Sequence, residues 1–287
     1  MSDQAWTSLR LVAWTQEFFA RKGVDAPRLT AELLLAHALR CDRVRLYLDF
    51  DKPLGGAELG AFRDLVRRRA DGEPTAYLTG RREFFGRAFR VDPRVLVPRP
   101  ETEVVAEAAL AALPEEGRAL DLCTGSGVLA VTLALGRRAR LVATDLSPGA
   151  LEIARENARS LGAEITFLEG DLDGPVAPGE RFDLLVSNPP YVPSGEIEGL
   201  SREVRREPRL ALDGGPDGLA LIRRIVALAP SRLAAGGTLV LEMHETHRET
   251  LPRLCREAGF ARAEARADLA GLPRLVVATM AGGPPGA

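Results

Sequence analysis

The chain has 287 residues, of which 46% are hydrophobic and 27% are charged, and its formal net charge at pH 7 is −2. These proportions are typical of one or two globular domains, and the near-zero charge does not favour a highly basic nucleic-acid-binding protein. The three cysteines show neither a disulfide framework nor a zinc-binding spacing, which favours a reducing, cytoplasmic location. We find no apolar run of the roughly 18 residues that a membrane span needs and no signal peptide, so we expect no membrane partner.

The first part of the chain carries only helical patterns. Apolar residues recur there at the spacing of a helix face, with no strand pattern between them. The sequence therefore predicts a small helical bundle over residues 1–75. The helices are expected over 8–23, 26–40 and 56–72.

The segment 83–102 differs, because polar and apolar residues alternate and a glycine and three prolines interrupt them. We interpret residues 76–101 as a connector with a β-hairpin. Nine arginines and four acidic residues lie between Val66 and Pro100. This excess of arginine is consistent either with a solvated face or with a docking stripe for an acidic protein or RNA.

From about Thr102 onward, strand patterns alternate with helix patterns. Ser147 is a candidate N-cap of one such helix, and Leu146 and Leu151 could form a hydrophobic staple around it. The alternation predicts an α/β domain over 102–280, a mostly parallel sheet with helices on both faces, followed by a disordered tail at 281–287. The expected strands are 118–123, 140–145, 165–171, 182–188, 237–243 and 274–280.

The ends of the first three strands indicate a nucleoside site. Gly125 and Gly127 allow the backbone to approach a ligand closely, and the helix that begins after them favours an anionic group. Asp145 ends the next strand about 20 residues later, where a carboxylate can accept hydrogen bonds from ribose hydroxyls. Asp171 ends the third strand and can reach a base edge, with Leu172 packing on the ring.

The sequence of the loop limits the class of ligand that can bind there. It reads D-x-C-T-G-S-G, which matches neither the G-x-G-x-x-G dinucleotide fingerprint nor a P-loop, and a tight turn with a helix cap would also explain its glycines. A nucleoside that carries an amino-acid carboxylate, such as S-adenosylmethionine, fits a short loop without a phosphate-sized glycine run. We expect S-adenosylmethionine, and the product S-adenosylhomocysteine, to bind at Cys123, Thr124, Gly125, Ser126 and Gly127.

The fourth strand ends on Asn-Pro-Pro-Tyr, an amide and an aromatic ring held by two rigid prolines. An amide or exocyclic amino nitrogen is a poor nucleophile, because its lone pair is conjugated. The Asn188 side-chain oxygen and the Pro189 carbonyl can accept its two N–H groups and stabilise the positive charge that develops on it. Tyr191 can lie on the flat face of the target group, and Pro190 helps to keep the geometry rigid. A proline-rich turn that only caps the strand is the simpler alternative.

Two further stretches, 73–103 and 207–219, make the sequence resemble the HemK/PrmC family of protein-(glutamine-N5) methyltransferases. The resemblance covers nearly the whole chain. It implies a Rossmann-like, seven-stranded class I methyltransferase domain after the helical bundle, which would dock the substrate. It also implies an enzyme that methylates the glutamine in the Gly-Gly-Gln loop of peptide chain release factors. We expect the enzyme to be cytoplasmic and monomeric, with no stable nucleic-acid partner.

For individual residues, the resemblance implies S-adenosylmethionine at the loop and beside Asn188, with Asp145 at the ribose. In the family, the residue after the Asp171 position helps to hold the adenine, and here that residue is Leu172, which would provide only apolar packing. The substrate glutamine would be bound by the Asn-Pro-Pro-Tyr motif, Asn188, Pro189, Pro190 and Tyr191. Cys123 departs from the family pattern, because a glycine is usual at that position.

Two other functions remain open on the sequence alone. An adenine-N6 DNA or RNA methyltransferase uses the same Asn-Pro-Pro-Tyr chemistry, although this chain has no appended target-recognition domain. A non-catalytic binding module on a methyltransferase fold is the second alternative. His244 and His247 could suggest a metal pair, but no third ligand is evident, and we predict no metal site.

Overall fold

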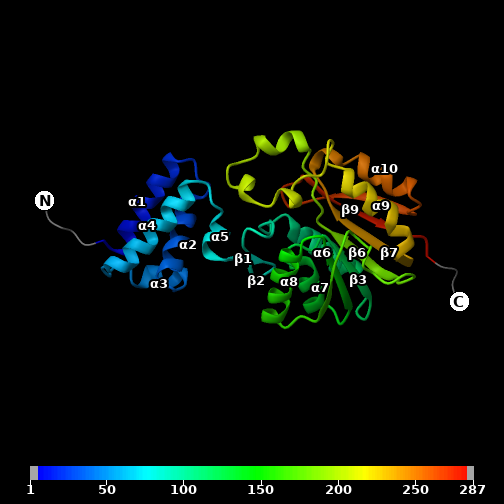
Figure 1. Cartoon of the computed structure of the whole chain (residues 1–287), viewed down its shortest axis with the longest axis horizontal. Coiled ribbons are helices and arrows are strands. Elements are labelled where there is room, and N and C mark those ends of the chain that lie inside the picture. The colour runs from blue at the N-terminus through cyan, green and yellow to red at the C-terminus, as the bar shows by residue number, and fades with distance from the viewer. Residues whose placement is uncertain (1–5, 283–287) are drawn as a thin grey trace. The chain divides into compact units, whose positions relative to one another are not determined.

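The structure is a computed structural model that describes residues 6–282 and forms two compact units (Figure 1). The first unit contains the chain up to Arg81 together with Ser201–Arg206, and the second contains Arg82–Leu200 and the chain from Glu207 onward. Within the described range, no helix is both long enough and apolar enough to cross a membrane. The tail expected at 281–287 lies outside the described residues from residue 283 onward.

The first unit is a bundle of helices around buried aromatic and aliphatic side chains such as Phe19, Leu34 and Phe62. The three helices predicted from the sequence are present. Two more, α3 and α5, have only six and five residues, which is too short to display a helical period in the sequence. The helices are α1 (Ser8–Arg21), α2 (Pro27–Ala38), α3 (Arg43–Leu48), α4 (Gly56–Ala70) and α5 (Thr75–Thr79).

The distant segment Ser201–Arg206 packs in this first unit at the end of α4. The buried guanidinium of Arg69 forms an ion pair with Glu203. Arg202 and Arg206 each donate a hydrogen bond to the carbonyl oxygen of Asp71, at 3.3 and 3.1 Å. A segment that lies far along the chain is therefore part of the helical unit.

The second unit begins with the hairpin β1 (Arg81–Phe84) and β2 (Arg87–Arg90) and then forms a seven-stranded sheet of order β5-β4-β3-β6-β7-β9-β8. Strands β3 to β7 are parallel, whereas β9 is antiparallel to both β7 and β8. The predicted α/β fold and seven-stranded sheet are confirmed. The strands are β3 (Arg118–Leu122), β4 (Arg140–Asp145), β5 (Ile165–Glu169), β6 (Phe182–Ser187), β7 (Leu233–Glu242), β8 (Arg262–Ala267) and β9 (Pro273–Thr279).

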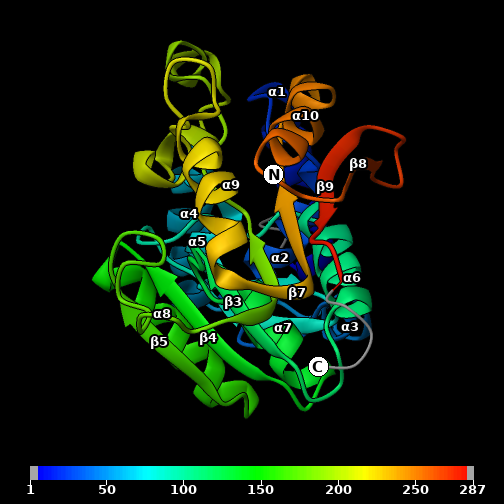
Figure 2. The same ribbon diagram turned by 90° about the vertical axis from the view of Figure 1, so that its right-hand side faces the viewer.

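Helices cover both faces of the sheet (Figures 1 and 2). One core joins α6, α7 and α8 to the hairpin and one face of the strands, and the other core joins α9 and α10 to the opposite face. Side chains alternate between the two cores, so that Ala119 belongs to the first and Leu120 to the second. The helices are α6 (Thr102–Ala112), α7 (Val128–Gly136), α8 (Pro148–Leu161), α9 (Ala220–Arg232) and α10 (Thr250–Glu257).

Strand order and register fix where the functional residues meet. The direction of winding reverses between β3 and β6, and ligands bind beyond the carboxyl ends of the strands at such a switch point. Leu122 is the register partner of both Thr144 on β4 and Ser187 on β6. The residues that follow this row, Cys123, Asp145 and Asn188, therefore leave the sheet side by side.

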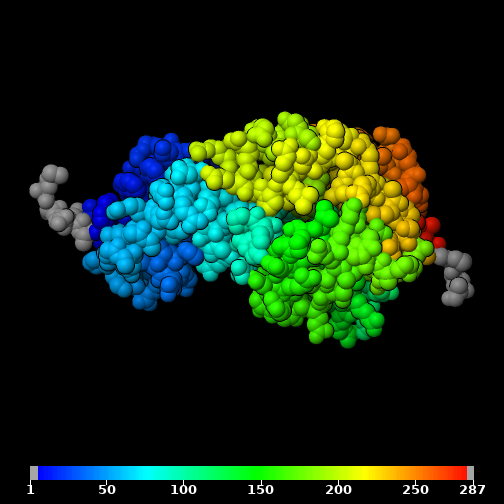
Figure 3. Space-filling view, viewed as in Figure 1, coloured from blue at the N-terminus to red at the C-terminus, as the bar shows by residue number. Residues whose placement is uncertain are grey.

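A long irregular segment between β6 and α9 contains the short 3₁₀ helices η1 (Ser194–Gly199), η2 (Val204–Arg206) and η3 (Arg209–Ala211). Its portion in the second unit is fixed by Glu207, whose buried carboxylate accepts the Val97 N–H at 2.9 Å and pairs with Arg99 at 2.6 Å. In the space-filling view, the yellow-green atoms of this segment adjoin the green part of the unit (Figure 3). The two stretches that carry the family resemblance are thus in direct contact.

Candidate active site

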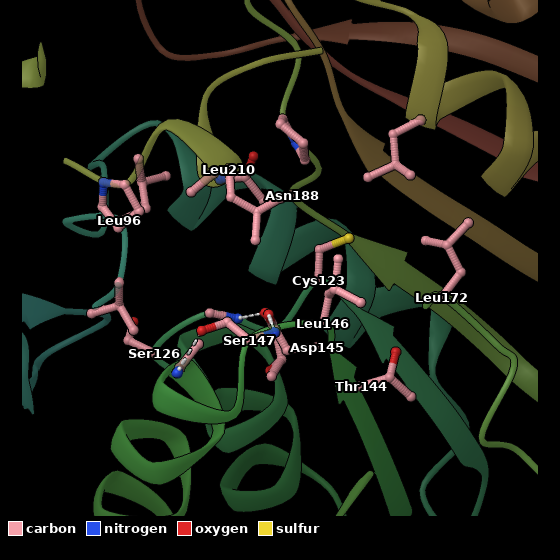
Figure 4. A pocket seen from close by; sticks show the side chains of 18 of the residues that line it. Leu96, Cys123, Ser126, Thr144, Asp145, Leu146, Ser147, Leu172, Asn188 and Leu210 are labelled. Atoms are coloured by element: carbon pink, nitrogen blue, oxygen red, sulfur yellow. Dashed lines mark hydrogen bonds between the residues drawn. The ribbon is translucent and has the colours of Figure 1, made fainter. Parts of the chain in front are cut away.

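A cavity of about 480 Å³ lies beyond the carboxyl ends of β3, β4 and β6 (Figure 4). Its walls come from the loop after each of these strands, from the connector that precedes α6, and from the segment before α9. Nine of the twelve residues predicted for the site line it. These are Cys123, Thr124, Gly125, Ser126, Asp145, Asp171, Leu172, Asn188 and Pro190.

The other three predicted residues, Gly127, Pro189 and Tyr191, are not part of the cavity lining. Gly127 instead allows the N-terminus of α7 to pack closely against α8. It has φ +82°, and a side chain there would meet the Cβ atom of Ala154 at 3.1 Å. A glycine at this position is therefore required by helix packing rather than by direct contact with a ligand.

The loop over 123–127 is held from below by the buried carboxylate of Asp121. Its Oδ2 atom accepts a hydrogen bond from the Thr124 hydroxyl at 2.6 Å and another from the Ala130 N–H at 3.2 Å. Burial raises the pKa of Asp121 to about 7, since a charged carboxylate loses its hydration there. The buried side-chain amide of Asn157 on α8 connects the loop to the hairpin. It donates hydrogen bonds to the Ser126 carbonyl at 2.9 Å and to the Arg90 carbonyl at 3.0 Å.

Asp145 joins this loop to the beginning of α8. One carboxylate oxygen accepts the Gly125 N–H at 2.8 Å, and the other accepts the Ser147 N–H at 2.9 Å (Figure 4). Burial raises the pKa of Asp145 above its ordinary value, and these backbone donors oppose that rise. Each carboxylate oxygen can accept more than one hydrogen bond, so the carboxylate keeps acceptor capacity toward the cavity.

Cys123 occupies a left-handed backbone conformation with φ +59°, which glycine adopts far more readily than a residue with a side chain. The chain tolerates the cysteine at this position without losing the loop, because the next two residues, Thr124 and Gly125, form their hydrogen bonds to Asp121 and Asp145. Burial raises the pKa of the thiol, so that it stays protonated beside the cavity.

Asp171 and Leu172 reach the cavity differently from each other. The side chain of Asp171 is 55% exposed and forms an ion pair with Arg224 of α9 at 2.8 Å. Leu172 is buried, at φ +51°, and packs in the core that contains α9. One therefore presents charge at the rim, and the other an apolar wall.

The Asn-Pro-Pro-Tyr backbone is enclosed by the glycines of 207–219. A side chain at Gly218 would lie 2.3 Å from the Tyr191 carbonyl oxygen, and one at Gly214 would lie 2.8 Å from the Tyr191 Cα atom. Val192 continues the contact, since its N–H donates to the Leu212 carbonyl at 2.9 Å. These close approaches explain two of the three glycines of that segment, Gly214 and Gly218.

The side chains of Asn188 and Tyr191 form hydrogen bonds with Thr102, which lines the cavity, and with Glu242. The Asn188 amide nitrogen donates to the Thr102 hydroxyl oxygen at 3.2 Å. The Tyr191 hydroxyl donates to the Glu242 carboxylate, also at 3.2 Å. Burial raises the pKa of Tyr191, so its hydroxyl remains a donor.

Sequence reasoning missed several residues of the cavity. Leu146 faces the cavity with 55% of its surface exposed, which the staple prediction with Leu151 did not anticipate. Leu210 lines it with 56% exposed. Two half-exposed leucines in one cavity indicate a surface that a ligand covers. The sequence did contain one signal for Leu146, because this leucine directly follows Asp145, the acid at the end of the strand.

Most of the arginines counted between Val66 and Pro100 have acidic partners. The paired arginines are Arg67, Arg68, Arg69, Arg90, Arg94 and Arg99. Among the residues that the structure describes, Arg81, Arg82 and Arg87 form no ion pair with a carboxylate. Little cationic charge is thus left for a docking stripe, which favours the reading of a solvated, internally paired face.

The fold and the cavity define a Rossmann-like methyltransferase. Residues 119–208 match a family model described as a methyltransferase domain, and residues 10–80 match one described as the PrmC N-terminal domain. A 16S rRNA N2 G1207 methyltransferase of T. thermophilus, solved with AdoMet and guanosine, is similar with a TM-score of 0.54 and 20% identity over 70% of this chain and 49% of that one. A methyltransferase from Pyrococcus furiosus is similar with the same TM-score and 19% identity over 69% of this chain and 91% of that one.

Curated proteins give a narrower assignment. The release factor glutamine methyltransferase of Geobacter sulfurreducens is 46% identical over 95% of this chain and 96% of its own length. That of Chlorobaculum tepidum is 47% identical over 84% of this chain and 87% of its own. The chain belongs to the family of release factor glutamine methyltransferases, as the sequence led us to expect.

Proposed function

We propose that this protein transfers a methyl group from S-adenosylmethionine to the side-chain nitrogen N5 of the glutamine in the Gly-Gly-Gln loop of peptide chain release factors. The observation that carries the proposal is the orientation of Asn188. Its amide nitrogen is engaged by Thr102 at 3.2 Å, so its side-chain oxygen is the atom available to a substrate. A substrate amide brings N–H donors, and an oxygen acceptor is the complementary group.

The residues around the cavity suit S-adenosylmethionine, which supplies an electrophilic methyl group when bound. The small side chains of the 123–127 loop, which allow a ligand to approach its backbone closely, would hold the amino-acid end, and the Asp145 carboxylate would accept hydrogen bonds from the ribose hydroxyls. Leu146 and Leu172 would cover the base, with Asp171 at its polar edge. The cavity of about 480 Å³ falls within the usual range for a small-molecule site.

Asn188 and the Pro189 carbonyl would orient the substrate nitrogen. Accepting both of its N–H groups holds the nitrogen in place and stabilises the positive charge that grows on it during transfer. The close approach of Gly214 and Gly218 to Tyr191 fixes the motif, so that little reorganisation is needed at the moment of reaction. Pro190 lines the cavity, and Tyr191 would form the adjoining border of the substrate site.

The helical unit, residues 1–75 together with the connector, would dock the release factor. A second cavity of about 420 Å³ lies in this unit, lined by Trp6, Trp14 and Phe18 among others. Trp6 and Trp14 are 39% and 48% exposed, and Lys22 lies over the Phe18 ring. Exposed aromatic rings beside cationic groups are typical of protein interfaces.

An adenine-N6 nucleic-acid methyltransferase is the alternative from a different substrate class. Its chemistry at Asn188 would be the same, but six of the nine arginines between Val66 and Pro100 have acidic partners, which leaves few positive charges for a phosphate backbone. We further expect a monomeric enzyme of the reducing cytoplasm with no stable nucleic-acid partner. The free thiols of Cys41, Cys123 and Cys255 support that compartment.

The deciding experiment is mass spectrometry of a purified release factor after incubation with the enzyme and S-adenosylmethionine. We expect one added methyl group that maps to the glutamine of the Gly-Gly-Gln loop. Transfer that maps elsewhere on the protein, or that appears only on DNA or RNA supplied in parallel, would overturn the proposal.

A further inference from the structure

Glu242, the last residue of β7, lies directly behind the substrate side of the cavity and is 1% exposed. Its Oε1 atom accepts the hydrogen bond from the Tyr191 hydroxyl at 3.2 Å. Its Oε2 atom is buried without an aligned partner among the described residues. A buried, incompletely satisfied carboxyl group is unfavourable for folding, so stability does not explain an acid at this position.

Thr102, the first residue of α6, connects this carboxyl group to Asn188. Its side chain is 1% exposed and receives the amide hydrogen of Asn188 on Oγ1. Its interaction with Glu242 favours the charged form of that acid, although no well-aligned hydrogen bond reaches Oε2. Because Oγ1 is already an acceptor, the hydroxyl hydrogen must be directed to another acceptor, and the neighbouring carboxylate is one.

Strand register brings these groups together. Ser187 on β6 is the partner of Leu241 on β7, so the next residues, Asn188 and Glu242, leave adjacent strands at the same level. In the series Asn188–Thr102–Glu242–Tyr191, the hydrogen bonds converge on Glu242. Both ends donate toward the carboxyl group, which must accept from both sides to preserve this arrangement.

Resting on the proposed function, we infer that Glu242 is a positioning residue: as a carboxylate it receives the Thr102 and Tyr191 hydroxyls and so holds the Asn188 oxygen toward the substrate glutamine. A reversed Asn188 amide would present its N–H groups to the N–H groups of the substrate. That arrangement cannot orient the nitrogen for methyl transfer. Glu242 acts through its neighbours and does not need to touch the substrate.

The direction of these hydrogen bonds depends on the charge of Glu242. Burial raises the pKa of Glu242 to about 7, while Thr102, Tyr191 and Arg274 of β9 favour the charged form and Glu101 opposes it. His244, whose ring lies 6.3 Å from the Tyr191 ring, is the nearby imidazole. A protonated Glu242 becomes a donor and can reverse the Thr102 hydroxyl, so turnover should fall as pH decreases through this range.

The test compares kcat against pH for the wild-type enzyme and Glu242→Gln, with a release factor and S-adenosylmethionine both saturating. For the wild type we expect kcat to fall about tenfold per pH unit below the Glu242 pKa. Glu242→Gln cannot ionise and brings an N–H donor, so its kcat should be lowered at least about tenfold at pH 8 and should lack this step. Calorimetric affinity for S-adenosylmethionine should stay within a few-fold of the wild-type value.

A matched pair at Thr102 keeps the test decisive if Glu242→Gln does not fold. Thr102→Val is nearly isosteric but has no hydroxyl, and we expect it to reproduce the loss of kcat. Thr102→Ser restores the hydroxyl and should recover most of the rate. A purely structural role would lower the melting temperature of both variants without separating their kcat values.

The outcomes also separate this inference from the proposed function. If the wild-type enzyme does not methylate the glutamine, the proposed function fails. If the wild type methylates it, but Glu242→Gln keeps wild-type kcat with the same pH profile, or Thr102→Val keeps wild-type kcat, Glu242 is not the positioning residue.

Discussion

The Asp145 carboxylate accepts the backbone N–H of Gly125 at 2.8 Å, so the acid that faces the cavity also fixes the loop beside it. The same side chain receives the N–H of Ser147 at the beginning of α8. One carboxylate therefore sets the relative position of two loops that follow neighbouring strands. Loss of this group should affect both the ligand contacts and the shape of the cavity.

Asp145→Ala is expected to weaken S-adenosylmethionine binding by one or two charge-assisted hydrogen bonds, roughly 1.5–3 kcal/mol each. Isothermal titration calorimetry measures this directly. Asp171→Ala is the control, because that side chain is 55% exposed and pairs with Arg224 at the rim, so its loss should matter less. Unchanged affinity in Asp145→Ala would contradict the ribose assignment.

Asn188→Ala should separate chemistry from cofactor binding. We expect kcat to fall by about 10²–10³, as in the deletion of a transition-state hydrogen-bonding group, while S-adenosylmethionine affinity stays nearly intact. Single-turnover methylation of a release factor, with calorimetry in parallel, gives both quantities. A loss of less than about fivefold, equivalent to about 1 kcal/mol, would match an ordinary hydrogen bond and rule out an orienting role.

Cys123→Gly should stabilise the protein, because φ +59° is unfavourable for a residue with a side chain. The expected gain is about 1 kcal/mol in the free energy of unfolding. Denaturant titration measures it, and Cys123→Ala is the matched control, since it removes the thiol but keeps the backbone strain. If the alanine variant gained as much as the glycine variant, the thiol and not the backbone would be the source.

Asp121→Asn should change how stability depends on pH. Burial raises the pKa of Asp121 to about 7 in the folded state, compared with an ordinary value of 3.8. The folded protein therefore binds this proton more tightly than the unfolded chain, and the stability linked to it is present at low pH and is lost as pH rises toward 7. Melting curves at pH 5 and pH 8 should show the variant gaining stability relative to the wild type at the higher pH. A pH-independent difference between the two proteins would show that Asp121 does not titrate there.

Trp14→Ala should test docking on the helical unit. Trp14 is 48% exposed and lines the cavity of that unit, so we expect KM for the release factor to rise about fivefold to tenfold, as for an interface residue worth more than 1 kcal/mol. Affinity for S-adenosylmethionine should not change. Leu29→Ala, at a residue of the same unit that is 41% exposed and does not line that cavity, is the control. Equal KM values for the wild type and Trp14→Ala would show that this cavity is not the docking surface.

The features that could be predicted from the amino-acid sequence are local ones. Periodicity predicts the parallel strands and the long helices, and strand ends mark Gly125, Asp145 and Asn188, because residues at the carboxyl ends of parallel strands must meet at one edge. Ser147 was also identified as a candidate N-cap, because serine is a preferred residue directly before a helix. Its hydroxyl oxygen accepts the Ala150 N–H at 3.2 Å. Such signals depend on neighbours within a few positions of the chain.

Other features depend on residues that are distant in the sequence, and these features are set by tertiary contacts. Strand β8, with the pattern Arg-Ala-Glu-Ala-Arg-Ala, alternates charged residues with alanines, which have a low strand propensity, and it forms where it pairs with β9 at the sheet edge. Leu146 faces a cavity because the connector and the 207–219 segment form the other walls of that cavity. Likewise, Thr102 and Glu242 come from separate elements, and only strand register and the beginning of α6 place them behind Asn188. Long-range contacts of this kind leave no pattern in a single sequence, because neither partner constrains the residues beside the other.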